Sequence, residues 1–173
     1  AFSTAPFSWE EVEGSTVRLT WKGSLDGEGS RELLLTKTFT FSPKGGIKAL
    51  YELKNLGDEL EAAFGVEFNL FFASLALGGG WMEVNGRRHP ILEELNLAEV
   101  PRVLFFDKAA GAKLELRWGK AARLFAFPVR TVSQSERGFE QTPQGLALLP
   151  SWRIAIPRGR RWRVTIHLSV GRV

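Results

Sequence analysis

Two polar side chains interrupt an otherwise apolar run at residues 64–70. Glu67 and Asn69 stand two positions apart, so on a β-strand both would project from the same face. A carboxylate and an amide in one cleft would offer the acceptors and donors that sugar hydroxyls require. Polar residues on a strand more often face solvent, and from these two residues alone the solvent-facing interpretation is favoured.

A second polar stretch, residues 131–145, separates two apolar runs. Loops carried by rigid sheets often hold binding residues, but the same side-chain types also satisfy the backbone of a long connection. Taken alone, the stretch slightly favours the second interpretation, in which its side chains satisfy the backbone of the connection and bind no ligand. The candidate binding residues within it are Ser133, Gln134, Ser135, Glu136, Glu140 and Gln144.

The tryptophans could provide flat apolar surfaces for a sugar ring. Trp81 follows three glycines and is the best candidate for an exposed ring, whereas Trp21, Trp118 and Trp162 are in phase with apolar strand residues. Trp81 is therefore the candidate stacking surface for a ligand, and core packing is the favoured interpretation of the other three.

The two histidines offer little for catalysis. A sugar epimerase on a β-sandwich would need a base, here Glu67 or Glu136, and an acid such as His89 or His167. Neither histidine stands in a recognisable arrangement, and the spacing of metal ligands, a P-loop and a dinucleotide-binding fingerprint are all missing from the sequence. With no Cys, disulfides and thiolate sites are impossible. We expect no metal and no cofactor.

Alternation of apolar and polar residues with a period of two dominates the sequence and predicts β-strands. Turns rich in Gly, Pro, Asn and Asp separate the runs, and one helical turn is expected at residues 91–97. The expected strands are residues 16–22, 33–41, 47–53, 64–75, 103–106, 113–118, 124–132, 146–156 and 161–170.

About nine short strands without a long helix predict an all-β antiparallel β-sandwich. The 173 residues suit one domain over residues 1–173, with residues 1–14 as a loose lead-in, and they are too few for an α/β barrel of about 250 residues. An apolar content of 44% excludes a disordered chain. No apolar stretch reaches the roughly 20 residues of a membrane span, and the first residues lack a secretory signal, so we expect a cytoplasmic protein without a membrane partner.

The net charge of +4 comes from the end of the chain. Residues 151–173 contain six Arg and no acid, whereas residues 1–150 contain 17 Lys and Arg against 19 Asp and Glu. Nucleic-acid binding would require these cations to converge on one face. We interpret them as a solvated turn and strand, and we expect no nucleic-acid partner.

Residues 64–70 and 129–145 together resemble the C-terminal β-sandwich domain of glycoside hydrolase family 57, which includes α-amylases and 4-α-glucanotransferases. The run Ser-Gln-Ser-Glu that begins at Ser133 is long and unusual, and the likeness extends over residues 17–152. Pro143 is a departure, because the family often has Tyr there. The resemblance implies a galactose-mutarotase-like supersandwich, which agrees with the number of expected strands.

The resemblance also implies a role without catalysis. The catalytic residues of that family lie in an N-terminal barrel that is absent here, so none is carried over and the chain is not expected to be an enzyme alone. A domain of this kind would dock to a catalytic barrel, in the same or another polypeptide, or bind an α-glucan such as a maltooligosaccharide. Glu67, Asn69 and the selected residues of 133–144 would then face a partner domain or a ligand.

Two rival hypotheses remain beside this one. The first is a mutarotase-like epimerase that uses a Glu/His pair, and the second is a protein-interaction module that docks through an apolar patch. The many charged residues and the scarcity of Met and Cys fit a thermophilic source.

Overall fold

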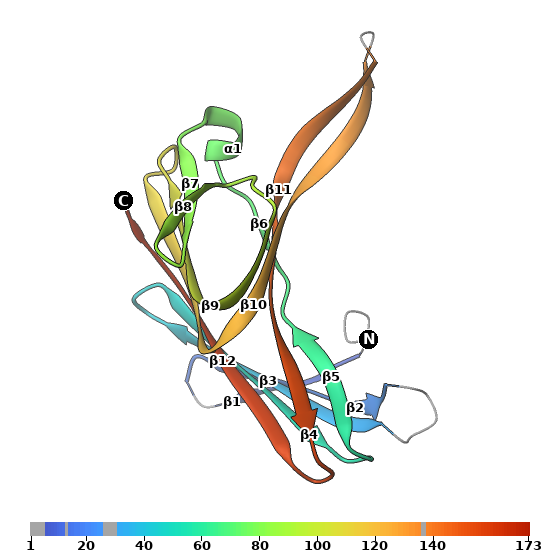
Figure 1. Cartoon of the computed structure of the whole chain (residues 1–173). Coiled ribbons are helices and arrows are strands. Elements are labelled where there is room, and N and C mark those ends of the chain that lie inside the picture. Colours follow the sequence, from blue (N-terminus) through green and yellow to red (C-terminus); the bar gives the residue numbers. More distant parts are fainter. Residues whose placement is uncertain (1–5, 13, 26–30, 136–137) are drawn as a thin grey trace. The chain divides into compact units, whose positions relative to one another are not determined.

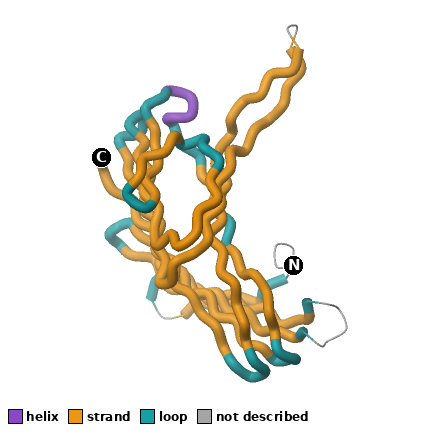
Figure 2. The backbone as a smooth tube through the Cα atoms, in the orientation of Figure 1, coloured by secondary structure: helices purple, strands orange, loops and turns teal. Residues whose placement is uncertain are grey.

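A computed structural model describes residues 6–12, 14–25, 31–135 and 138–173 (Figure 1). These residues form twelve strands, which pair antiparallel, and one short helix (Figure 2). The predicted all-β antiparallel fold is confirmed. The elements are β1 Ser8–Val12, β2 Thr16–Ser24, β3 Glu32–Ser42, β4 Gly46–Asn55, β5 Leu60–Gly65, β6 Phe68–Leu70, α1 Ser74–Leu77, β7 Gly80–Val84, β8 Arg87–Pro90, β9 Leu95–Asp107, β10 Ala112–Ser135, β11 Gly138–Ile156 and β12 Arg161–Arg172.

The chain divides into two compact units. Unit 1 consists of residues 1–64, 118–120 and 153–169, and unit 2 of residues 65–117, 121–152 and 170–173, so that β10, β11 and β12 contribute to both. The single domain over residues 1–173 stays a prediction. Of the expected lead-in, residues 1–5 and 13 lie outside the described residues, and Ser8–Val12 form β1.

Unit 1 is built on five neighbouring strands in the order β1-β2-β3-β4-β12. Period-two patterning buries one face of the central strands, where Leu35 on β3 and Leu53 on β4 are each 1% exposed. β5 covers this face, because the ring of Phe64 lies 5.8 Å from that of Tyr51 and 5.3 Å from that of Trp162. Packing of β5 on the sheet gives unit 1 its apolar core.

A buried amide joins the turn after β4 to the end of β11. Asn55 is fully buried, and its Nδ2 donates to the carbonyl oxygens of Asp58 at 2.6 Å and Ile156 at 2.7 Å. Its Oδ1 accepts a hydrogen bond from the backbone N–H of Gly57 at 3.1 Å. One side chain thus satisfies three backbone groups at this corner of unit 1.

Unit 2 holds β6 to β9 and most of β10 and β11, and its strand order is β8-β7-β9-β10-β11-β6. The strands of this unit are curved (Figure 1). Buried apolar side chains from several of them form its interior. Met82, Phe105, Leu124 and Leu146 are each 0% exposed. The segment after β6 closes onto this interior, where the rings of Phe72 and Phe105 lie 5.0 Å apart.

Three local predictions are wrong. Residues 91–97 form no helical turn, because β9 already begins at Leu95; the helix is α1, which begins at Ser74, within the run 64–75 that was predicted as one strand. That run is apolar almost throughout, and a run without periodicity does not distinguish a strand from a helix. The expected loop at 133–144 is also wrong, because residues 133–135 belong to β10 and residues 138–144 to β11, and the two strands pair as a long hairpin.

Candidate functional site

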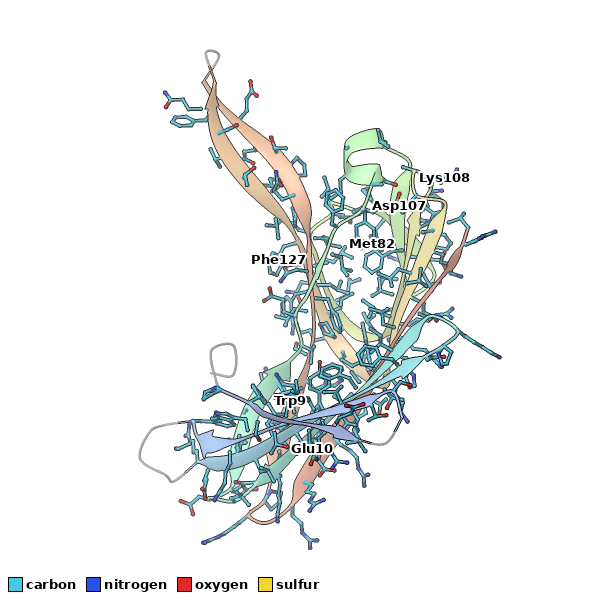
Figure 3. All side chains as sticks on the ribbon, turned by 180° about the vertical axis from the view of Figure 1, so that it is seen from behind. Trp9, Glu10, Met82, Asp107, Lys108 and Phe127 are labelled. Atoms are coloured by element: carbon cyan, nitrogen blue, oxygen red, sulfur yellow. The ribbon has the colours of Figure 1, made fainter. Side chains whose placement is uncertain are left out.

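Strand pairing places the two polar stretches on one face of unit 2. Asn69 on β6 pairs with Ala147 on β11, and Ala147 pairs with Phe127 on β10. Directly paired residues project to the same side of a sheet, so all three belong to one face, which we call the outer face. Phe127 is 43% exposed and Asn69 is exposed, while the small Ala147 between them is 2% exposed, so the outer face meets solvent at Asn69 and Phe127 (Figure 3).

A pocket of about 230 Å³ lies on the outer face, and we call it the amide pocket. It brings together Asn69 and Gln144, which the sequence analysis selected from two separate stretches. Asn69 Nδ2 donates to Glu67 Oε1 at 2.9 Å, and Gln144 Nε2 donates to Thr131 Oγ1 at 3.0 Å. The lining residues are Asn69, Leu70, Phe71, Val129, Gln144, Gly145 and Leu146.

These two hydrogen bonds orient the amides of the pocket. Each amide nitrogen has two N–H groups, and one of them is engaged by Glu67 or by Thr131. The second N–H and the amide oxygen of both Asn69 and Gln144 stay available as a donor and an acceptor. The pocket therefore presents neutral, paired donor and acceptor groups, which match hydroxyl groups better than they match a charged ligand.

Phe71 forms an apolar wall of the amide pocket with 72% of its surface exposed. Its backbone is fixed on both sides: Leu70 pairs with Leu146 on β11, and Phe72 is buried against Phe105. An exposed aromatic ring on such a supported segment loses little conformational freedom when a ligand covers it. The sequence analysis missed Phe71, because one exposed ring inside an apolar run has no pattern of its own.

Asp107 holds the segment that follows Phe71. Its buried carboxylate, at the end of β9, accepts hydrogen bonds from the backbone N–H groups of Ala73 at 2.7 Å, Ser74 at 3.1 Å and Ala110 at 3.1 Å, and from the Ser74 hydroxyl. Burial by itself would raise the pKa of this carboxyl, but the four hydrogen bonds outweigh it and hold the pKa below its ordinary value. Asp107 is thus an ionised anchor beneath the pocket wall.

A second, larger pocket of about 440 Å³ adjoins the first along β10. Phe125 and Phe127 line it, and Arg123 Nε donates to Asn96 Oδ1 at 2.8 Å at its side. The other lining residues are Glu94, Leu95, Asn96, Ala126 and Leu149. The outer face therefore combines aromatic rings and polar side chains over two neighbouring depressions.

The remaining selected residues lie on the hairpin of β10 and β11. Ser133 pairs with Glu140 on the side of the outer face, Gln134 pairs with Phe139 on the opposite side, and the backbone of Ser135 pairs with Gly138. Glu136 lies outside the described residues. The structure thus separates Gln134 from Ser133 and Glu140, and none of the three lines the amide pocket.

Trp81 is half-buried, so the expectation that it is the exposed tryptophan is wrong. Its ring stacks on Phe106 with centroids 4.7 Å apart, and the guanidinium of Arg88 lies 3.9 Å from the ring centre. Phe106 and Arg88 come from β9 and β8, the two strands that flank β7. An exposed indole is found instead at Trp9, which is 71% exposed in unit 1 (Figure 3).

Neither histidine lines the amide pocket. His89 Nδ1 lies 3.2 Å from Glu93 Oε2, and His167 is on β12 opposite Lys48. The pocket thus lacks the histidine that the epimerase hypothesis requires. Within the described ranges no group of His, Asp and Glu is placed to hold a metal ion, and no helix has the length and apolar character to cross a membrane.

Comparison with known proteins identifies the family. The model of the family described as "Alpha-amylase/4-alpha-glucanotransferase, C-terminal" matches residues 1–166. The chain belongs to this family. It is 30% identical over 131 residues to Alpha-amylase 1 of Dictyoglomus thermophilum, a match that covers 75% of this chain and 19% of that protein. The chain therefore spans about a fifth of the length of this curated relative, and the resemblance seen at residues 64–70 and 129–145 is confirmed for the C-terminal domain.

Solved structures show the same fold. The crystal structure of 4-alpha-glucanotransferase from Thermococcus litoralis has a TM-score of 0.73 and 22% identity, covering 95% of this chain and 22% of that one. The crystal structure of a putative aldose 1-epimerase from Escherichia coli K12 has a TM-score of 0.75 and 11% identity, covering 96% of this chain and 69% of that one. The predicted mutarotase-like β-sandwich is thereby confirmed.

Proposed function

We propose that this chain is the non-catalytic C-terminal domain of an α-glucan-acting enzyme and that it binds α-glucan at the amide pocket. The proposal rests on one observation: Asn69 and Gln144 line the same pocket as the exposed ring of Phe71. A glucose unit has an apolar C–H face that can lie on an aromatic ring, and its rim of hydroxyls both donates and accepts hydrogen bonds.

The chemistry of the pocket fits a neutral sugar. The free amide oxygens of Asn69 and Gln144 would accept from sugar hydroxyls, and their second N–H groups would donate to them. Phe127, further along β10, would extend the apolar surface toward the second pocket. An open pocket of about 230 Å³ lies below the usual range of small-molecule sites, so we expect a Kd of about 1 mM for a maltooligosaccharide.

Titration of the ¹⁵N-labelled chain with maltoheptaose, followed by NMR, tests the proposal. The side-chain NH₂ signals of Asn69 and Gln144 should shift with saturation, because these groups contact the sugar. Gln134 is the internal control, since it projects to the other side of the hairpin, and its NH₂ signal should not shift. Equal shifts at all three amides, or no shift at tens of millimolar sugar, would overturn glucan binding at this pocket.

Two substitutions separate the aromatic surface from the amides. Phe71→Ala removes the ring and should weaken binding by about tenfold, the equivalent of about 1.4 kcal/mol. Asn69→Ala removes neutral hydrogen bonds worth about 1 kcal/mol and should weaken binding by about fivefold. Phe41→Ala is the matched control, because Phe41 is a 45% exposed Phe in unit 1 and its loss should leave the affinity unchanged.

A further inference from the structure

The long hairpin of β10 and β11 extends beyond the sheet of unit 2 (Figure 1). β9 pairs with β10 only as far as Ala126, and β6 pairs with β11 only over Leu146–Leu148. We call the extension, residues 130–135 and 138–143, the arm. Each of its strands is paired with the other and with no further strand among the described residues. A two-stranded ribbon of this kind is at best marginally stable in water.

One side of the arm carries exposed apolar side chains. Val132 is 62% exposed and Phe139 is 78% exposed. Val132 pairs with Gln141, and Gln134 pairs with Phe139, so alternation puts Val132 and Phe139 on one side. On β10 this is the side that faces the interior of unit 2 at Leu124 and Ala126. The arm thus continues the core-facing side of the strand into a region where nothing described covers it.

The arm lies within residues 1–166, the range that the family model matches. The segments matched by this chain make up 19% of Alpha-amylase 1 of Dictyoglomus thermophilum and 19% of the 4-alpha-glucanotransferase of Thermococcus litoralis. Most of each relative thus lies outside the segment that this chain matches.

We propose that the arm docks, through Val132 and Phe139, onto the catalytic part of an α-amylase/4-α-glucanotransferase-type polypeptide that contains this domain. Six residues of strand span about 20 Å, so one side of the two-stranded arm covers roughly 200 Å². This area is too small to hold two separate chains, which need about 1,000 Å² or more. It can add to the contact between two domains of one polypeptide, because the covalent link supplies a high effective concentration.

Photo-cross-linking in the whole polypeptide tests the docking. The complete reading frame that contains residues 1–173 is expressed with p-benzoylphenylalanine in place of Phe139, and peptides joined by irradiation are identified by mass spectrometry. We expect position 139 to cross-link to residues outside 1–173 in the same polypeptide. The matched control is the same probe at Leu77, which is 76% exposed on α1 and away from the arm. Its yield of such cross-links should be at least tenfold lower.

A second variant tests the apolar contact itself. Val132→Lys keeps the hairpin backbone but places a charge on the proposed contact, so it should lower the cross-link yield at position 139 several-fold. Equal yields at positions 139 and 77, cross-links confined to residues 1–173, or cross-links between two copies would each overturn the proposal. A reading frame without further chain would overturn it too. Glucan binding is measured separately, on residues 1–173 alone, so either proposal can fail without the other.

Discussion

Replacing Asp107 should release the segment that supports the pocket wall. In the folded chain its carboxylate accepts four hydrogen bonds, three of them from backbone N–H groups, and Asp107 is only 6% exposed. Asp107→Ala removes the acceptor from all of these groups. A donor left unsatisfied in a buried position costs about 1 to 3 kcal/mol, and the low end applies here because Ala73 and Ala110 are partly or fully exposed.

The expected loss of stability for Asp107→Ala is therefore about 3 to 4 kcal/mol. For a chain of this size each kcal/mol lowers the Tm by about 2 to 4 °C, so the melting temperature should fall by about 10 °C. Circular dichroism and calorimetry on the wild type and the variant at pH 7 measure this shift. Asp58→Asn is the control, because Asp58 is exposed and its carboxylate accepts no hydrogen bond from the residues that the structure describes.

The pH dependence of the melting temperature gives an independent test of the role of Asp107. The folded-state pKa of Asp107 is lowered, so the ionised carboxylate contributes stability above the unfolded-state pKa of about 3.9 and loses it as the pH falls through the folded value. Asp107→Asn has no such titration. The difference in Tm between wild type and Asp107→Asn should be constant from about pH 5 to pH 8 and shrink below about pH 4. A difference that persists unchanged to pH 3, or a Tm of Asp107→Ala within 2 °C of wild type, would refute the reasoning.

Two further substitutions probe the elements that position the site. Asn55→Ala takes the donor from the carbonyls of Asp58 and Ile156, whereas the Gly57 N–H keeps the Glu32 carbonyl as acceptor; it should cost about 2 to 4 kcal/mol in urea unfolding, and a loss below 1 kcal/mol would contradict the buried-corner role. Gly145→Ala would put a Cβ 2.7 Å from the carbonyl oxygen of Leu70, so β6 should separate from β11 and its amides should exchange hydrogen faster. Gly119→Ala, whose Cβ would meet nothing closer than 3.9 Å, is the control and should leave this exchange unchanged.

The strand content could be predicted from the sequence because most strands have one buried and one solvated face. β12 is an example, with Val164 and Ile166 each 2% exposed between more exposed neighbours. The arm could not be predicted in this way, because a ribbon exposed on both faces has no apolar alternation. Its polar residues therefore resemble those of a loop. The hairpin is recognised only from the residue-by-residue pairing of β10 with β11 in the structure.

The pocket could be predicted only in part. The spacing of Glu67 and Asn69 was enough to put both on one face, and their hydrogen bond bears this out. The roles of Phe71 and Asp107 could not be predicted from the sequence. They depend on contacts between segments more than 30 residues apart, such as the hydrogen bond from Ala73 to Asp107. Nothing in the local sequence distinguishes such a carboxylate from a solvated one.

A single extra residue decides which part of the polar stretch faces the pocket. The pairing shifts between Val129, opposite Gly145, and Arg130, opposite Pro143, so that Gln144 is the unpaired residue of a β-bulge. With strict alternation back from Ala147, Phe139 would share the face of Asn69, and Glu140 would not. The bulge reverses this order, because every residue beyond it changes sides. Glu140 therefore falls on the side of the amide pocket and Phe139 on the docking side. One hairpin can thus carry a polar surface for a sugar and an apolar surface for a protein without the two competing.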